Sequence, residues 1–309
     1  MTDDGEMVSV NGVELFVRRL GDPALPMLVV IHGGPTWDHG YLLPAVAELA
    51  DAAHVVMFDL RGCGRSSRTP PVGSLPVDAL QPDYLADDVA GLVRYFDGRR
   101  ADVLGFSYGG GVAMRVAEQH PDVLRSVILA STTAYRDFQD ELDASADYRE
   151  RGVLCTDIRF DDPVLTGPDA PDGALSRAMA YGSAPRDIWQ LDRLEEWHRV
   201  LERTCFSSDW NMPHAAGLLR PAAPDDPARV LREWRGPVLL VHGQREMGFP
   251  VGVARRLHAE VPASRLAEVP DAAHMAHFDN PSAWLGAIRA FLRTRDPEDP
   301  DSTGPMGQE

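Results

Sequence analysis

Short apolar runs recur along the first part of the chain and again after residue 236, with more polar stretches between them. Uninterrupted runs of this kind are typical of strands that are buried on both faces of a parallel sheet. Such strands are expected at residues 27–31, 54–58, 103–106, 123–130, 237–241 and 265–269. Because helical spacing separates most of these runs, the pattern predicts crossover connections and an α/β fold, with a mainly parallel sheet covered by helices on both faces.

Other segments complete this predicted framework. Residues 8–10 and 14–20 predict two short strands that turn at Asn11-Gly12, a dipeptide suited to a tight antiparallel hairpin at the sheet edge. Helices are expected at residues 42–50, 84–96, 112–119, 251–260 and 282–293. The proline-rich residues 69–76 predict irregular backbone.

The alternation of strands and helices stops at Thr132. The chain is then polar and irregular up to residue 235, with charged helical stretches at residues 137–151 and 188–203. Since the buried-strand pattern resumes afterwards, the middle segment is interpreted as an insertion into one sheet. We therefore predict a core of residues 1–132 and 236–295, a mostly helical cap of residues 133–235, and a disordered acidic tail of residues 296–309.

The sequence Gly105-Phe106-Ser107-Tyr108-Gly109 joins a predicted buried strand to a helix. A serine between two glycines at such a turn is typical of a nucleophile elbow, in which the glycines leave room for closely approaching backbone. The turn exposes the serine hydroxyl and aims the first amides of the helix at a reacting carbonyl. Ser107 is therefore the candidate nucleophile, provided that the chain also supplies its partners.

A serine nucleophile requires a general base, and the base requires an acid that orients it. In enzymes with a nucleophile elbow, the acid and then the histidine follow the serine along the chain. Glu246 and His274 fit this order, and each follows a predicted strand. His277 is the main alternative base. Asp271 and Asp279 are alternative acids, although both lie close to the histidine in the sequence.

Composition excludes several classes of protein. The chain has 309 residues, of which 44% are hydrophobic, enough for a substantial core, and its formal net charge is -17. All 30 of its Lys and Arg residues are arginine, which excludes a Schiff-base lysine and a Walker-type phosphate loop. So acidic a chain is not expected to bind nucleic acid. The three cysteines are widely spaced and indicate neither a disulfide framework nor a zinc site.

The first residues are acidic and lack the basic and then apolar pattern of a secretory signal. No apolar run reaches the length that spans a membrane. We therefore expect a cytoplasmic protein with reduced thiols and no membrane partner. The sequence leaves the oligomeric state open.

Together these motifs resemble those of the α/β-hydrolase superfamily, and within it those of the proline-iminopeptidase-like serine hydrolases. The resemblance covers nearly the whole chain except the tail, and it is weakest over the cap. The motifs are His32-Gly33-Gly34-Pro35, the loop 59–66, the elbow at Ser107, the His242-Gly243 strand end with its acid, and the loop of His274. The resemblance implies an α/β-hydrolase fold with a cap and a triad of Ser107, Glu246 and His274. It also implies an oxyanion hole of the Gly34 and Tyr108 amides, and neither a metal nor an organic cofactor.

The chain departs from the family pattern at several positions. Glu246 stands where most members have Asp, and Phe106 and Tyr108 flank the serine where the peptidases usually carry Gly and Trp. Thr36 and Ala273 stand where glycine is common. These differences preserve the chemistry of hydrolysis, but they weaken the inference to removal of an N-terminal proline.

Candidate substrate contacts are His277, Phe106, Trp189 and Trp210. The two tryptophans lie in the predicted cap, where such residues more often form its core. The cap also carries Glu195, Glu196 and Glu202, with which an aminopeptidase could hold a substrate ammonium group. A solvated face of a charged helix is the simpler interpretation of these three residues.

The sequence thus predicts an enzyme that cleaves an ester, lactone or amide bond of a small molecule or short peptide through an acyl-serine intermediate. One alternative is an aminopeptidase of the proline iminopeptidase type. Another is a fold recruited to a non-hydrolytic role, such as cyclisation or ligand binding. A cofactor-free haloperoxidase-like activity would use the same residues. Because the cap sets specificity, the sequence does not identify the substrate.

Overall fold

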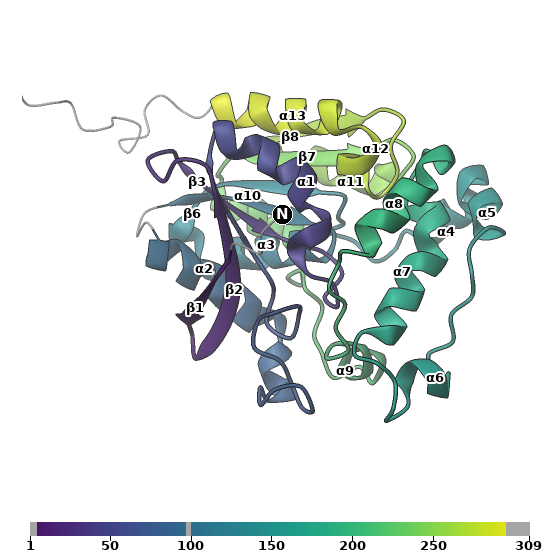
Figure 1. Cartoon of the computed structure of the whole chain (residues 1–309). Helices are drawn as coiled ribbons and strands as arrows, with labels where there is room; N and C mark the ends of the chain where they lie inside the picture. Colours follow the sequence, from purple (N-terminus) through teal and green to yellow (C-terminus); the bar gives the residue numbers. More distant parts are fainter. Residues whose placement is uncertain (1–4, 97–99, 295–309) are drawn as a thin grey trace, which may run out of the picture.

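A computed structural model describes residues 5–96 and 100–294 of the chain. Their strands form an eight-stranded sheet in the order β1-β2-β4-β3-β5-β6-β7-β8 (Figure 1). The strands are β1 Glu6–Val10, β2 Val13–Leu20, β3 Met27–Ile31, β4 His54–Phe58, β5 Ala101–Phe106, β6 Leu124–Ala130, β7 Val238–Gly243 and β8 Ser264–Val269. The tail predicted at residues 296–309 lies outside the described residues.

The predicted hairpin at the sheet edge is confirmed. Strands β1 and β2 pair antiparallel with Val10 opposite Val13, and the turn between them has positive φ at Asn11 (50°) and Gly12 (76°). Strand β2 is also antiparallel to β4. All other neighbouring strands pair in parallel, which confirms the mainly parallel sheet.

Alternating side chains of the central strands fill two hydrophobic cores, one on each face of the sheet. Val29 of β3 and Val103 of β5 belong to one core, and the next residues, Val30 and Leu104, belong to the other. The period of two along a strand produces this division, and it explains why a strand such as β3 is apolar at consecutive positions.

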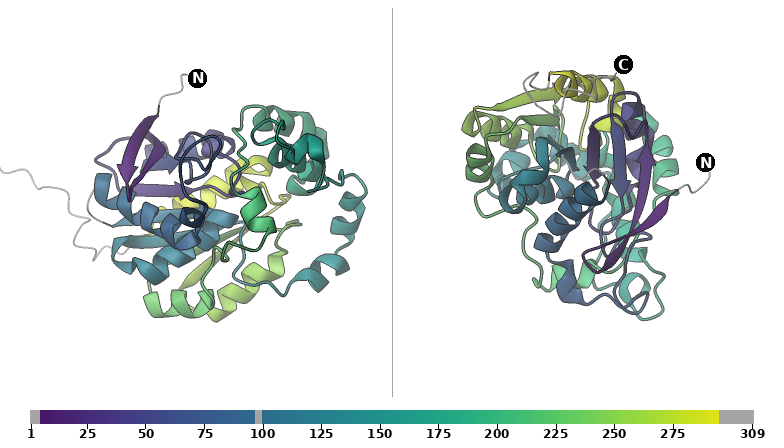
Figure 2. Two further views of the ribbon diagram at one scale, coloured as in Figure 1. Left: turned by 90° about the horizontal axis from the view of Figure 1, so that it is seen from below. Right: turned by 90° about the vertical axis from the view of Figure 1, so that its left-hand side faces the viewer.

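Helices cover both cores. Helices α2 Pro82–Phe96, α3 Tyr108–Gln119, α10 Pro227–Trp234 and α11 Val251–Glu260 contribute to the first core, and α1 Leu43–Val46 and α13 Pro281–Arg293 to the second. Figure 2 shows helices on either side of the sheet. The helix expected at residues 42–50 is α1 with short 3-10 turns around it, η1 His39–Tyr41 and η2 Ala47–Asp51.

The predicted cap segment is helical over much of its length. It contains α4 Gln139–Ala144, α5 Ala146–Gly152, α6 Pro163–Thr166, α7 Ala174–Asp187, η5 Leu191–Arg193, α8 Leu194–Leu201 and α9 Asn211–Ala215 (Figure 1). Helix α7 was not predicted, because its small and polar residues give little apolar periodicity. Helix α10 lies against α3, with Val230 and Leu231 in the first core. The exact limits of the cap therefore stay a prediction.

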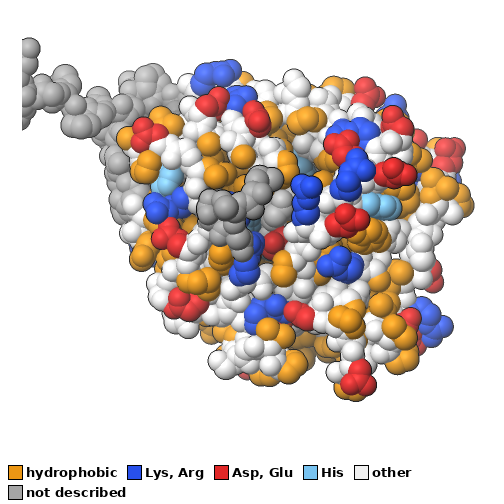
Figure 3. Space-filling view, viewed as in Figure 1, with side chains coloured by type: hydrophobic (Ala, Val, Ile, Leu, Met, Phe, Trp, Pro, Cys, Tyr) orange, Lys and Arg blue, Asp and Glu red, His pale blue; other side chains and the backbone are white. Residues whose placement is uncertain are grey.

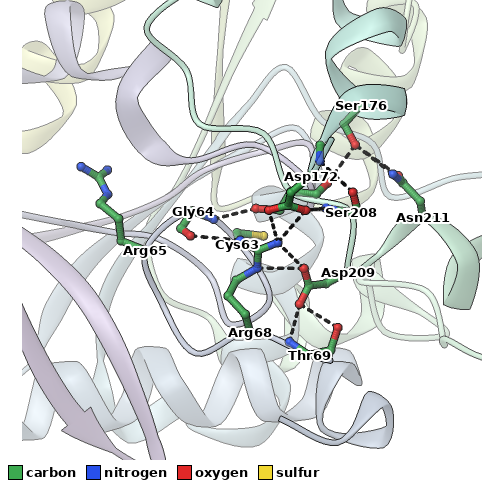
Figure 4. A network of polar contacts seen from close by, with 12 residues as sticks. Cys63, Gly64, Arg65, Arg68, Thr69, Asp172, Ser176, Ser208, Asp209 and Asn211 are labelled. Carbon is green, nitrogen blue, oxygen red and sulfur yellow. Dashed lines mark hydrogen bonds and ion pairs between the residues drawn. The ribbon is translucent and has the colours of Figure 1, made fainter. Parts of the chain in front are cut away.

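A buried ion network fastens the cap segment to the irregular stretch after β4 (Figure 4). The guanidinium group of Arg68 donates to the carboxylates of Asp209 and, at 2.8 Å, Asp172. The other oxygen of Asp209 accepts hydrogen bonds from the amide and the hydroxyl of Thr69. Since the side chains of Arg68 and Asp209 are buried, removal of Arg68 would leave the charge of Asp209 uncompensated, and the pair holds the two segments together.

Charged side chains of both signs are interspersed on the face shown in Figure 3. Several arginines pair with acids, as Arg193 does with Glu196 and Arg289 with Asp51. Within residues 5–96 and 100–294, no helix is long and apolar enough to cross a lipid bilayer.

Candidate active site

Ser107 lies in the sharp turn between β5 and α3. Its backbone has φ 52° and ψ -118°, a strained conformation for a residue other than glycine, which typically costs about 1–3 kcal/mol. A Cβ atom on Gly105 would lie 2.2 Å from the carbonyl oxygen of Gly109, and one on Gly109 would lie 2.3 Å from that of Ile31. The turn therefore requires glycine at both positions, as a nucleophile elbow does.

His274 joins Ser107 to Glu246. The Nε2 atom of His274 lies 3.1 Å from Oγ of Ser107, and its Nδ1 atom lies 2.9 Å and 3.1 Å from the two carboxylate oxygens of Glu246. In the tautomer that satisfies both contacts, Nδ1–H donates to Glu246, and Nε2 accepts the hydroxyl proton of Ser107. The three residues predicted as a triad are thus brought together from three loops that follow β5, β7 and β8.

The loop after β7 holds the glutamate in place. The amide of Gly248 donates to Oε1 of Glu246 at 2.7 Å, and the amide of Phe249 lies 3.3 Å from the same oxygen. The side chain of Glu246 is fully buried. A short turn of the loop therefore accommodates the extra methylene of glutamate and still directs its carboxylate at His274.

The electrostatics of the site favour a protonated His274 more than burial alone would. Burial lowers the pKa of His274, but the charges of Glu246 and Asp187 outweigh it and raise the net pKa above its usual value. Burial likewise acts to raise the pKa of Glu246, and the neighbouring His274 holds the net pKa below its usual range. An ionised Glu246 beside an imidazole that charges easily is the arrangement required for general base catalysis.

The loop after β3 lies directly against the elbow. A Cβ atom on Gly33 would lie 2.6 Å from Cβ of Ser107, and the amide of Gly33 donates to the hydroxyl of Tyr41 at 2.8 Å. Gly34 has φ 49°. For the amides of Gly34 and Tyr108, the two predicted oxyanion donors, the described parts of the chain supply no hydrogen-bond acceptor. Both are thus available to a ligand.

Two other histidines at strand ends support the loops of the site. His32 Nδ1 lies 2.8 Å from the carbonyl oxygen of Gly33, and its Nε2 accepts the amide of Leu60 at 3.0 Å. Burial lowers the pKa of His32 to about 4, so the ring is neutral near pH 7. His242 Nε2 lies 2.6 Å from the carbonyl oxygen of Phe249. Both rings contact backbone, as expected of structural histidines.

The loop 59–66 contacts the loop after β3, where the amide of Leu60 donates to Nε2 of His32. The buried carboxylate of Asp59 accepts hydrogen bonds from His39 Nδ1 at 2.6 Å and from Arg65 Nε at 3.1 Å. Burial opposes its ionisation, but the contacts with His39 and Arg65 hold the pKa of Asp59 well below its usual range. The loop is thus internally bonded, in keeping with the structural role expected for it.

The alternative acids do not contact His274. Asp271 is exposed, with φ 50°. Asp279 is buried, and its carboxylate accepts hydrogen bonds from the amides of Ala273 at 2.8 Å and of Trp189 at 2.9 Å. In addition, the carbonyl oxygen of Asp187 accepts a hydrogen bond from the amide of Met275 at 2.8 Å. These bonds tie the loop of His274 to the cap segment that follows α7.

The predicted substrate contacts occupy different places. Phe106 is buried between His274, at a ring distance of 5.3 Å, and His277, at 5.2 Å. His277 is also buried and does not contact Ser107. Trp189 is partly exposed and lies between the guanidinium groups of Arg151 and Arg245. Trp210 is buried behind Tyr108 and donates to the carbonyl oxygen of Arg61 at 3.1 Å.

The acidic cap residues lie on an exposed helix face. Glu195, Glu196 and Glu202 are all exposed, and both carboxylate oxygens of Glu196 accept hydrogen bonds from Arg193, at 2.8 Å and 2.9 Å. This placement favours the interpretation of these residues as a solvated surface.

Ser107 opens into a cavity of about 500 Å³. Its lining is formed by Ser107, Tyr108, Gly111, residues 132–136, residues 221–225 and Phe249. The volume lies in the usual range for small-molecule sites. Over residues 5–96 and 100–294, no group of three or more His, Cys, Asp or Glu side chains is arranged to hold a metal ion.

Sequence reasoning missed several residues at the site. Asp187 ends α7, accepts the hydroxyl of Ser183 at 2.7 Å, and acts electrostatically on His274. Thr132 donates to the carbonyl oxygen of Ser107 at 2.7 Å, and the ring of Phe249 lies 5.7 Å from that of His274. The position of Thr132 directly after β6 was a usable signal, because strand ends gather at the site. Nothing local marks Asp187.

A mainly parallel sheet with a strained serine, a histidine and a carboxylate meeting at its strand ends defines an α/β hydrolase. The model of the alpha/beta hydrolase family matches residues 28–287. The chain belongs to this family and is a hydrolase, and the resemblance seen in its motifs is confirmed.

Relatives within the family have several activities. The chain is 26% identical to 2-(acetamidomethylene)succinate hydrolase of Mesorhizobium japonicum, over 92% of this chain and 94% of that protein. It is 25% identical to a proline iminopeptidase of Levilactobacillus brevis, over 94% of this chain and 97% of that protein. Among solved structures, a thermophilic esterase from Thermogutta terrifontis has a TM-score of 0.68 and 26% identity, covering 94% of this chain and 98% of that one.

Proposed function

We propose that the protein hydrolyses an ester, lactone or amide bond of a small molecule through an acyl-serine intermediate. The observation that carries this proposal is the continuous chain of hydrogen-bond contacts from Ser107 through His274 to Glu246. These contacts support the proposed roles, and the serine opens into a cavity of suitable size.

In the first half-reaction, Nε2 of His274 takes the hydroxyl proton as Oγ of Ser107 attacks the carbonyl carbon of the substrate. The ionised Glu246 keeps the proton on Nδ1 and stabilises the imidazolium that forms. Negative charge on the carbonyl oxygen is met by the amides of Gly34 and Tyr108. Removal of one such donor typically slows an enzyme by about a hundred- to a thousandfold. The imidazolium then protonates the leaving group, and the acyl group remains on Ser107.

In the second half-reaction, water takes the place of the leaving group. His274 removes a proton from the water, which attacks the acyl-serine carbonyl, and the same proton returns to Ser107 as the acid product departs. No step requires a group that the chain does not supply. The cavity beside Ser107 admits the acyl or the leaving portion of a small substrate.

Two measurements test the assignment of the nucleophile. The wild-type protein should hydrolyse a small p-nitrophenyl ester and should be labelled by a fluorophosphonate at Ser107. Replacement Ser107→Ala should abolish both, whereas Ser131→Ala, a change at another serine with positive φ that follows a core strand, should abolish neither. Labelling that persists in Ser107→Ala, or ester turnover that does so, contradicts the proposal.

A second candidate is an aminopeptidase that grips a free amino group. The observation behind it is Asp187, a carboxylate at the end of α7 whose charge raises the pKa of His274. Burial raises the pKa of Asp187 to about 6, so the group is mostly ionised near pH 7. Comparing free with N-acylated amino-acid anilides separates the candidates. Only an enzyme that holds the ammonium group should lose activity toward the N-acylated anilide.

A further inference from the structure

Two charged side chains line the cavity beside Ser107, Arg136 after β6 and Asp225 before α10. The rest of the lining is uncharged and mixes hydroxyl-bearing residues with apolar ones, among them Ala222, Ala223 and Phe249. Neither charged group forms an ion pair or a side-chain hydrogen bond with any residue in the described ranges. Both are therefore available to a ligand whose scissile carbonyl lies at Ser107.

The lack of an ion-pair partner has a different meaning for Asp225 than for Arg136. The chain has 47 acidic and 30 basic residues, so at least some acids must lack a basic partner, and an unpaired Asp225 is an ordinary remainder. Exposed arginines without an ion pair occur elsewhere in the described residues, as at Arg199 and Arg203, and Arg136 is itself exposed. Arg136 differs from them because it lines the cavity beside Ser107.

The two residues that flank Arg136 form contacts with other side chains, whereas the side chain of Arg136 does not take part in these contacts. Arg256 of α11 lies over the ring of Tyr135 at 3.7 Å and donates to both carboxylate oxygens of Asp137, at 3.0 Å and 3.1 Å. The amide of Tyr135 also donates to Oγ1 of Thr133 at 3.0 Å. Both sequence neighbours of Arg136 are thus anchored, and Asp137, the nearest acid in sequence, is already occupied.

We propose that Arg136 binds a carboxylate of the substrate, so that the enzyme acts on an ester, lactone or amide with a carboxylate separated from the scissile carbonyl by an apolar chain. This inference rests on the hydrolytic function proposed above. A guanidinium group offers paired N–H donors that match the two oxygens of a carboxylate. The apolar part of the lining, Ala222, Ala223 and Phe249, offers contacts for the connecting chain. A local cation also offsets the repulsion that a protein of charge -17 exerts on an anion.

The test compares two esters that differ only in charge, the p-nitrophenyl monoester of adipic acid and its methyl-capped diester. The measured quantity is the ratio of kcat/KM for the acid to kcat/KM for the methyl ester, with the rate of the Ser107→Ala variant subtracted. Wild-type enzyme should favour the acid. Arg136→Met should lower the ratio about tenfold, as expected for loss of one charged contact at a partly solvated site. Arg136→Glu should lower it further.

The matched control is Arg199→Met on α8, since Arg199 is an exposed arginine that does not line this cavity. This control should leave the ratio at its wild-type value. Raising the salt concentration should lower the ratio for wild type and leave it nearly constant for Arg136→Met, because salt screens the charge that the variant lacks.

The outcomes separate this inference from the proposed function. An enzyme that hydrolyses the methyl ester through Ser107, with a ratio that Arg136→Met does not change, overturns the carboxylate assignment alone. A third outcome is that the enzyme prefers an ester with a terminal ammonium over both the acid and the methyl ester, and that Asp225→Asn loses this preference. That outcome overturns the carboxylate assignment in favour of a cationic substrate. Absence of Ser107-dependent turnover of any ester overturns the proposed function itself.

Discussion

The carboxylate of Asp279 accepts the amide hydrogen of Ala273 at 2.8 Å, one residue before His274. The same carboxylate accepts the amides of Trp189, at 2.9 Å and 3.0 Å to its two oxygens, and of Gln190, at 3.4 Å. One buried side chain therefore holds both the loop of His274 and the cap segment after α7. The sequence places Asp279 near His274, and the structure gives it the role of positioning rather than of orienting the imidazole.

Replacement Asp279→Ala should lower both stability and kcat. It leaves the buried amide of Ala273 without its acceptor, at a typical cost of about 1–3 kcal/mol, together with the partly buried amides of Trp189 and Gln190. It also frees the loop that carries His274. Because misplacement of the base affects the chemical step, kcat on a p-nitrophenyl ester should decrease while KM changes little. This decrease should be seen at temperatures well below the unfolding transition of the variant.

The matched control for this prediction is Asp51→Ala, which removes an exposed ion pair with Arg289. It should change the free energy of unfolding by no more than about 1 kcal/mol and leave kcat unaltered. Asp279→Asn retains one acceptor oxygen and should lie between the alanine variant and wild type. A loss of stability in Asp279→Ala with full kcat on the remaining folded protein would show that the tie does not position His274.

The rate of hydrolysis should rise with pH through a midpoint above 6.5, the usual pKa of histidine. In the proposed mechanism His274 accepts a proton only when neutral, and although burial lowers its pKa, the charges of Glu246 and Asp187 raise the net value. Replacement Asp187→Asn removes one of these charges and should shift the midpoint of the kcat/KM profile to lower pH. Asp122→Asn, an exposed change far from the site in a pair with Arg94, should not shift it.

The same pKa shift has a consequence for stability. A histidine whose pKa is raised in the folded state stabilises that state fully below its unfolded pKa, and the contribution is lost as the pH rises through the folded pKa. The contribution of His274 to the free energy of unfolding should therefore decrease above pH 6.5.

For the rate profile, a midpoint below pH 6.5, or a midpoint that Asp187→Asn does not shift, contradicts this account of the electrostatics.

The framework of the site followed from the sequence because it depends on local patterns. Apolar runs located the strands, and the order of serine, acid and histidine after them selected Ser107, Glu246 and His274, which the structure brings within hydrogen-bond distance. Asp187 was missed, since helix α7 has weak apolar periodicity and the contact with His274 spans residues distant in the chain. Arg136 was missed for a related reason. Its lack of a partner is visible only when Arg256 is seen to occupy Asp137.

Substitution of Gly109 in the elbow should strongly destabilise the fold. A Cβ atom there would lie 2.3 Å and 2.6 Å from the carbonyl oxygens of Ile31 and His32, which are backbone atoms that cannot move aside cheaply. We expect Gly109→Ala to lower the melting temperature sharply or to prevent folding. Gly286→Ala in α13 meets nothing within 4 Å and should stabilise the protein by up to about 1 kcal/mol. Thermal unfolding of both variants tests the pair, and a Gly109→Ala protein with wild-type melting temperature would refute the close approach.

His277 should limit stability in acid. Both of its ring nitrogens are buried, and burial outweighs a contact with the backbone of Tyr41 and lowers its pKa to about 3. A histidine with a depressed folded pKa contributes stability that is present above its unfolded pKa of about 6.5 and is lost as the pH falls toward the folded value, by up to about 1.4 kcal/mol per pH unit.

Replacement His277→Phe keeps an aromatic ring among Tyr41, Phe106 and Trp284 and removes the group that titrates. Its free energy of unfolding in urea should decline less between pH 6.5 and 4.5 than that of wild type. His32→Phe is the informative comparison, because His32 also has a low pKa but forms two backbone hydrogen bonds. That variant should be destabilised at every pH, since its loss of bonds does not depend on titration. Parallel pH curves for wild type and His277→Phe would show that residue 277 does not titrate on unfolding.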